Sequence, residues 1–172
     1  KLIGSGGRDF GIRVTGNISG IDWVVAAVSG NDGGTTVVNS TDNNTAKDII
    51  ARIGVAPIEN LNLGVSVYKD CSNGAIASRI GGDLKYEKAP IYFQLEYIYG
   101  KDGDLDKNGC YIEAGYSIEK LQPIVRAEYY DGNAGAEDSS DVMIGAFGVN
   151  YYFNESAKIQ LICELKKDKL GA

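Results

Sequence analysis

Basic side chains recur at alternating positions of strand-like segments, where they would share one face of a sheet. Successive side chains of an extended strand point to opposite faces, so alternate residues line the same surface. On a surface in contact with water, arginine and lysine offer charged hydrogen-bond donors to oxyanions. The predicted chemistry is therefore the guidance of small anions. The candidate anion-facing residues are Arg13, Arg52, Arg79, Lys85, Arg126 and Lys158, and Lys166 belongs to the same face.

Carboxylates occupy the same predicted face and give the basic residues a second potential role. These acidic residues are Asp83, Glu96, Glu113, Glu128 and Glu164. Opposite charges that face each other on neighbouring strands form stabilising cross-strand pairs. The sequence leaves two alternatives open, a ladder of cations that attracts anions or a set of cations neutralised by cross-strand carboxylates.

One acidic segment has the ligand spacing of a calcium-binding loop. Such a loop carries oxygen ligands at positions 1, 3, 5 and 12. The residues at these positions are Asp102, Asp104, Asp106 and Glu113. The sixth position, which requires glycine, holds Lys107, and the flanking segments are strand-like rather than helical. We therefore expect a solvated acidic loop in preference to a Ca²⁺ site, and no other cofactor.

The polar face is poorly equipped for catalysis. The chain contains no histidine, the general base on which barrel enzymes of the outer-membrane protease and lipid-deacylase kinds rely. Carboxylate pairs can also transfer protons, but nothing in the sequence places two of them in a closed pocket. We expect no enzymatic activity.

The elements that would position these side chains are about ten short strands of alternating polarity. A composition of 23 glycines and 11 tyrosines against 3 prolines fits strands joined by glycine-bearing turns. The pattern predicts an all-β fold, with one domain over residues 1–172. The expected strands are 10–18, 21–29, 49–55, 61–68, 76–86, 91–99, 112–118, 121–129, 143–153 and 159–165.

The connections between these strands alternate in length. The expected short turns are 19–20, 58–60, 87–90 and 154–156, and the expected long polar loops include 30–47, 101–109 and 131–141. Outer-membrane barrels have short periplasmic turns and longer external loops, and about nine to eleven tilted residues cross the hydrocarbon. The alternation predicts an antiparallel up-and-down transmembrane β-barrel, or a partial barrel, of about ten strands in a lipid bilayer.

Aromatic residues gather toward both ends of the expected strands. Trp23, Tyr86, Phe93, Tyr116 and Phe153 lie near short turns, and Phe10, Tyr68, Tyr97 and Tyr99 lie near long loops. Amphipathic rings at the two membrane interfaces form such girdles in barrels. The longest apolar run, Trp23 to Val28, is far shorter than the roughly 20 residues of a membrane helix. Any crossing of a membrane must therefore use strands.

Charge and cysteine content exclude other classes of protein. A net charge of -6, with basic residues scattered singly, argues against binding of nucleic acid. Cys71, Cys110 and Cys163 form no C-x-x-C pair, which disfavours a zinc site. Cys71 and Cys110 would lie at the same end of the sheet. A bridge between them is one interpretation, and free, small apolar residues are the favoured one.

Four strand-and-turn phrases are distinctive. They are Gly64–Tyr68, Tyr92–Tyr97, Pro123–Tyr130 and Gly148–Asn154, of which PIVRAEYY and GVNYYFN are the most specific. With these phrases the chain, from Phe10 to about Leu165, resembles the C-terminal part of the phosphate-selective porin O and P family. The resemblance implies a sixteen-stranded, often trimeric, anion-conducting channel in the outer membrane of a Gram-negative cell.

The expected strand order puts both chain ends on the long-loop side, whereas a complete bacterial barrel normally begins and ends on the periplasmic side. We therefore expect a segment of a larger barrel, or an unusually closed small one.

The leading hypothesis is an outer-membrane porin-like channel for small hydrophilic, including anionic, solutes. One alternative is a non-conducting surface barrel or adhesin that binds a partner through its long loops, chiefly 30–47. Another is a soluble β-sandwich binding module, in which Ile53, Val65, Phe93 and Phe147 would be buried.

Overall fold

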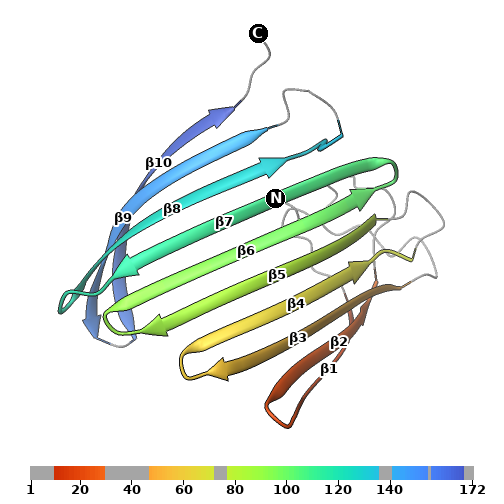
Figure 1. Ribbon diagram of the computed structural model, residues 1–172, viewed down its shortest axis with the longest axis horizontal. Helices are drawn as coiled ribbons and strands as arrows, with labels where there is room; N and C mark the ends of the chain where they lie inside the picture. The colour runs from red at the N-terminus through yellow and green to blue at the C-terminus, as the bar shows by residue number, and fades with distance from the viewer. Residues whose placement is uncertain (1–9, 30–46, 72–76, 136–140, 155, 169–172) are drawn as a thin grey trace.

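The computed structural model describes residues 10–29, 47–71, 77–135, 141–154 and 156–168. These residues form one antiparallel sheet of ten strands that follow each other in chain order (Figure 1). The strands are β1 (Gly11–Ile18), β2 (Ile21–Val28), β3 (Asp48–Ile58), β4 (Leu61–Lys69), β5 (Ala77–Lys88), β6 (Ile91–Asp102), β7 (Leu105–Tyr116), β8 (Leu121–Asp131), β9 (Val142–Asn154) and β10 (Ala157–Asp168). The prediction of an all-β, up-and-down arrangement of about ten strands is confirmed. No helix in the described ranges is long and apolar enough to span a membrane.

The alternation of polarity along each strand gives the sheet two chemically distinct faces. Ile53 of β3 lies opposite Val65 of β4, and the next pair along, Arg52 and Ser66, points to the other side. A slip of one residue would exchange the two faces, so the alternation strongly favours this register. We call the first surface the apolar face, and its exposed members include Val14, Val25, Ile53, Val65, Ile80, Leu95, Ile112, Val125, Phe147 and Leu161. The polar face carries Asp22, Arg52, Ser66, Asp83, Glu96, Glu113, Arg126, Asn150 and Glu164.

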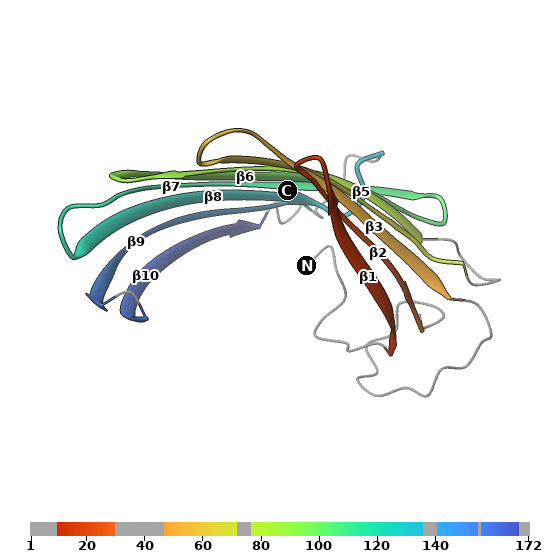
Figure 2. The same ribbon diagram turned by 90° about the horizontal axis from the view of Figure 1, so that it is seen from below.

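The sheet is curved, and its edge strands β1 and β10 bend toward the same side (Figure 2). Side chains on the concave side of a curved sheet are crowded together, while those on the convex side spread apart. Ala26, Ile124, Ala146 and Asn150 are buried, and the register puts all four on the polar face. The polar face is therefore the concave one.

The curved sheet is not closed. Within the described residues, β1 pairs only with β2, and β10 pairs only with β9. Backbone groups on the outer edges of both strands are thus available for pairing.

Tight turns join the strands at one end of the sheet, the end at which the short connections were predicted. Ser19 and Gly20 link β1 to β2 with positive φ angles of 51° and 82°. Asn60, between β3 and β4, has a φ of 68°, and Glu119, between β7 and β8, has a φ of 54°. Asparagine and glycine tolerate this left-handed conformation well, which suits them to such turns. The predicted loop 30–47 lies outside the described residues except for Lys47, and part of 131–141 lies outside them as well.

The predicted polar loop at 101–109 is wrong. Strand β6 continues to Asp102 and β7 begins at Leu105, so only two residues turn the chain, with Gly103 at a φ of 60°. Lys101 lies opposite Asp106 in the extended ladder. Cross-strand pairs of opposite charge stabilise strand residues of low intrinsic β propensity. The connection is therefore short, unlike the other connections predicted at this end.

The predicted aromatic girdle residues lie mainly on the apolar face. Tyr97, Tyr116 and Phe153 are exposed there. Tyr68 is an exception, because it lies on the polar face opposite Arg79 and its hydroxyl donates a hydrogen bond to Asp48 Oδ2 at 2.6 Å. The odd positions of β4 carry the apolar residues, and Tyr68 occupies an even one.

The only tryptophan of the chain packs against edge strand β1. Trp23 lies on the apolar face directly opposite Gly16, and a Cβ at Gly16 would collide with the indole ring. The missing side chain thus leaves room for the indole to lie across the strand, and the aromatic ring covers backbone that glycine leaves exposed. Trp23 is consequently held at a defined place on the apolar face.

Candidate functional site

The candidate functional site is the middle of the polar face, where the register of β5 to β10 brings charged side chains into adjacent rows. One row consists of Lys85, Gln94, Glu113, Arg126, Ala146 and Glu164. The next row consists of Asp83, Glu96, Tyr111, Glu128, Ile144 and Lys166. Residues predicted to share a face from alternation alone thus become direct neighbours.

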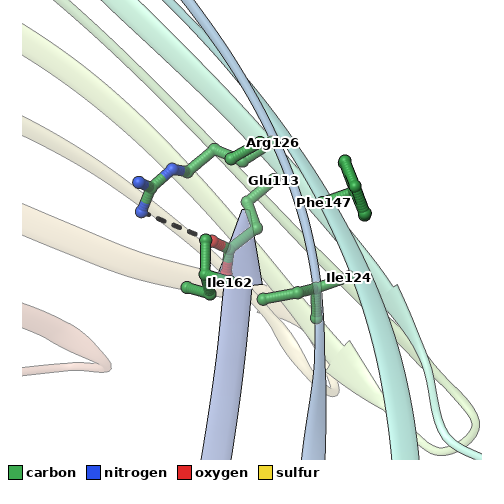
Figure 3. Close-up of a pocket in the computed structure, with 6 residues that line it drawn as sticks. Glu113, Ile124, Arg126, Phe147 and Ile162 are labelled. Carbon is green, nitrogen blue, oxygen red and sulfur yellow. Dashed lines mark ion pairs between the residues drawn. The ribbon is translucent and has the colours of Figure 1, made fainter. Parts of the chain in front are cut away.

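Arg126 is surrounded by three carboxylates. Its Nη2 donates a hydrogen bond to Oε1 of Glu164 at 2.9 Å, and its Nε lies 2.7 Å from Oε1 of Glu128. Glu113 lies 3.9 Å from Nη1, the ion pair drawn in Figure 3. The small, buried Ala146 stands between Arg126 and Glu164 in the row, so the guanidinium can reach across β9 to β10. In the same view Phe147 extends from the opposite side of the sheet.

Arg52 makes a similar crossing over β4. Its guanidinium forms a bidentate pair with the carboxylate of Asp83 on β5, with 2.8 Å between Nη2 and Oδ2. Gly64 lies opposite Asp83 on the intervening strand, and a Cβ there would collide with the Arg52 guanidinium. In both crossings an arginine passes over a small residue to a carboxylate two strands away.

A third arginine is engaged at the end of the sheet near the β6–β7 turn. Arg79 is paired with Asp102, and its Nη1 donates to the carbonyl oxygen of Lys101 at 3.0 Å. Lys107 Nζ donates to Asp102 Oδ2 at 2.6 Å. Asp102 thus pairs with both cations and holds them at this end of the sheet.

The remaining candidate cations differ in their surroundings. Lys85 Nζ lies 2.6 Å from Glu87 Oε2 on its own strand and 5.8 Å from the centre of the Tyr92 ring. Lys158 lies 5.8 Å from the centre of the Tyr152 ring. Within the described ranges, neither Lys158 nor Arg13 has a carboxylate partner. Of the two alternatives for the basic residues, neutralisation by carboxylates on other strands thus applies to Arg52, Arg79 and Arg126. It does not apply to Arg13 and Lys158 within the described residues.

The candidate calcium ligands are not brought together. Asp106 accepts a hydrogen bond from the Tyr99 hydroxyl at 2.6 Å, and Asp102 is engaged by its two basic partners. Asp104 lies in the β6–β7 turn, while Glu113 lies well along β7, opposite Gln94. In the part of the chain that the structure describes, no three His, Cys, Asp or Glu residues are grouped closely enough to hold a metal ion.

The three cysteines are free and exposed, so Cys71 and Cys110 do not form a bridge. Cys110 lies opposite Tyr97, and Cys163 lies opposite Phe147, which puts both thiols on the apolar face. This placement agrees with the prediction that they act as small apolar residues.

No family model matches the sequence, and a search of curated proteins finds no match. The resemblance to phosphate-selective porins therefore stays a prediction. The function has to be inferred from the two faces of the sheet and from the charges on the polar one.

Proposed function

We propose that the chain forms the wall of a porin-like channel in the outer membrane, through which small hydrophilic solutes pass. The observation that carries this proposal is the exposed apolar face, which extends over all ten strands. Phe147 is 57% and Leu161 71% exposed there. Soluble monomeric proteins rarely expose a contiguous apolar patch larger than a few hundred Å². Lipid is the natural cover for such a surface on a sheet.

Strand length supports the same proposal. β3 and β5 to β10 each contain between 11 and 13 residues. A tilted strand crosses the hydrocarbon with about nine to eleven residues. These strands are therefore long enough to cross a bilayer and to extend into water at their ends.

The charged polar face supports an aqueous pathway. Ionised side chains inside a membrane protein face a water-filled cavity or the protein interior because hydrocarbon cannot solvate them. The concave polar face carries the ion pairs of Arg52 and Arg126. In a curved wall with lipid on its convex side, this face lines the water.

A soluble β-sandwich is less well supported. The described strands belong to one sheet, with no second sheet among them, and Ile53, Val65 and Phe147 are exposed. Phe93 is half-buried within that single sheet. The adhesin alternative depends on the loop 30–47, which lies outside the described residues apart from Lys47.

The proposal requires the edges of β1 and β10 to be paired in the membrane, because unpaired backbone groups cost several kcal/mol each in hydrocarbon. Pairing of the two strands with each other or with further strands meets this requirement. Hydrogen exchange of the protein in lipid vesicles tests it. We expect the amides of both edge strands to be protected, and fast exchange along either edge contradicts the requirement.

Recording from planar lipid bilayers tests the channel function. The protein, refolded in detergent and added to one side, is expected to produce discrete steps of conductance because its polar face lines an aqueous pathway once the edges of β1 and β10 are paired. Detergent buffer alone is the control for leaks. Protein that inserts into lipid without conducting supports the surface-barrel alternative, whereas protein that remains monomeric in water without detergent contradicts the membrane assignment.

A further inference from the structure

The middle of the polar face between β5 and β8 contains more acidic than basic groups. The four carboxylates of Asp83, Glu96, Glu113 and Glu128 lie in the two adjacent rows. Among the described residues, only two guanidinium groups form ion pairs with these carboxylates. Arg52 is paired with Asp83, and Arg126 is paired with Glu113 and Glu128. Arg126 also forms an ion pair with Glu164 on β10. We call the set of four carboxylates and two arginines the central cluster.

Lys85 and Lys166 lie at the borders of the same rows, and neither removes this local imbalance. The ammonium group of Lys85 is turned to Glu87, which forms a neutral pair with it. Lys166 is on β10, where Ile144 separates it from Glu128 in the row. The excess of negative charge is therefore concentrated at β5 to β8.

Glu96 is the least compensated member of the central cluster. It lies directly opposite Asp83, and like charges in that position repel each other. The guanidinium of Arg52 is engaged by Asp83 in bidentate geometry. No ion pair or hydrogen bond to the carboxylate of Glu96 occurs among the described residues, and its other neighbour in the row is Tyr111. The register places Glu96 on the concave polar face. It is half-buried there, so water screens its charge less than it screens a fully exposed carboxylate.

We infer that Glu96 is a specificity-determining residue of the proposed channel and that the central cluster makes this part of the wall favour small cations over anions. The inference rests on the proposed function, because it needs an aqueous pathway along the polar face. Carboxylates on the wall of a pore favour the passage of cations. Both arginines of the central cluster, Arg52 and Arg126, are paired with other carboxylates. Arg52 acts on Glu96 only through its charge, which Asp83 shares, and no ion pair or hydrogen bond to Glu96 occurs among the described residues. The carboxylates would act on ions that pass along the wall rather than bind one at a fixed site, because the described residues form no group that could hold a metal ion.

The test is the reversal potential of single channels in a tenfold gradient of potassium chloride, for the wild type and for Glu96→Gln. We expect the wild type to prefer potassium. A unit charge about 7 Å from the path of an ion changes its local concentration roughly threefold in water. Glu96→Gln should therefore lower the ratio of potassium to chloride permeability by roughly threefold or more. Because no hydrogen bond or ion pair to the Glu96 side chain occurs among the described residues, its amide replacement leaves the contacts described above in place.

Two variants serve as controls. Glu96→Asp keeps the charge and should keep the wild-type preference. Glu59→Gln makes the same chemical change in the β3–β4 turn, away from the central cluster, and should leave the ratio unchanged. A wild-type channel that prefers chloride overturns this inference, and so does a ratio of potassium to chloride permeability that Glu96→Gln does not alter. Either result is still compatible with the proposed channel function. Failure of the inserted wild type to conduct at all overturns both.

Discussion

Replacing Ile112 by arginine is expected to destabilise the membrane-inserted protein by about 2–4 kcal/mol, the cost of a cation at the lipid-facing midplane of a barrel. Ile112 lies in the interior of β7 on the apolar face, between Leu95 and Ala127, and is 41% exposed. An arginine there would be surrounded by acyl chains if lipid covers this face. Urea titration of the protein refolded in lipid vesicles measures the change.

The neighbouring residue provides a matched control. Tyr111 lies on the polar face with a carboxylate on either side in its row, Glu96 and Glu128. In Tyr111→Arg the loss of the hydrogen bond from Gln94 is offset by these opposite charges. The expected cost is about 1 kcal/mol or less. Equal costs at the two positions would show that the two faces do not differ in their contact with lipid.

Gly148→Ala is expected to destabilise the protein by about 1–3 kcal/mol, as overpacking typically does. A Cβ at Gly148 would collide with the carbonyl oxygen of Leu161 on β10 and lie 3.0 Å from Cγ1 of Ile162. The Leu161 carbonyl is backbone, which cannot turn away as a side chain can, so the pairing of β9 with β10 has to shift. The free energy of unfolding in vesicles is again the measured quantity.

Gly145→Ala is the control for this prediction because it makes the same change on the same strand. A Cβ at Gly145 meets no atom within 4 Å. The substitution should be neutral or stabilise the protein by up to about 1 kcal/mol, because alanine restricts the unfolded chain. If Gly148→Ala is as well tolerated as Gly145→Ala, the close approach of β9 and β10 described above is incorrect.

The ion pairs of the polar face contribute more to its charge than to stability. The side chain of Arg52 is 40% exposed and that of Asp83 is 23% exposed, so water screens their attraction. Pairs in exposed surroundings typically contribute about 0–1 kcal/mol. Their main consequence is that the paired arginines, Arg52, Arg79 and Arg126, present little free positive charge to a passing solute.

The two faces of the sheet could be predicted from the sequence because alternation is a local property. Ile53 and Arg52 fall on opposite faces whatever their partners are. The β6–β7 connection could not be predicted in this way. Its polar residues lack apolar alternation, and they extend the strands through pairing of Lys101 with Asp106 across the hairpin.

The alternation of polarity also could not predict which charged residues of the candidate site pair with each other. The pairing of Arg126 with Glu164 joins residues on β8 and β10, and it depends on the register of three strands and on the small side chain of Ala146 between them. The opposition of Asp83 and Glu96 likewise follows from register alone. Sequence reasoning identified which charges share a face, and only the paired strands determine which of them are neutralised.

The contact of the apolar face with lipid is tested most directly by the fluorescence of Trp23, because the chain has no other tryptophan. Trp23 lies on this face against Gly16, so no substitution is needed to introduce a probe. The protein is refolded into vesicles whose acyl chains carry bromine close to the headgroups, and acrylamide is added to the water in a parallel sample. We expect strong quenching by the brominated lipid and little by acrylamide. Strong quenching by acrylamide with no effect of the brominated lipid would contradict the assignment of the apolar face to the membrane.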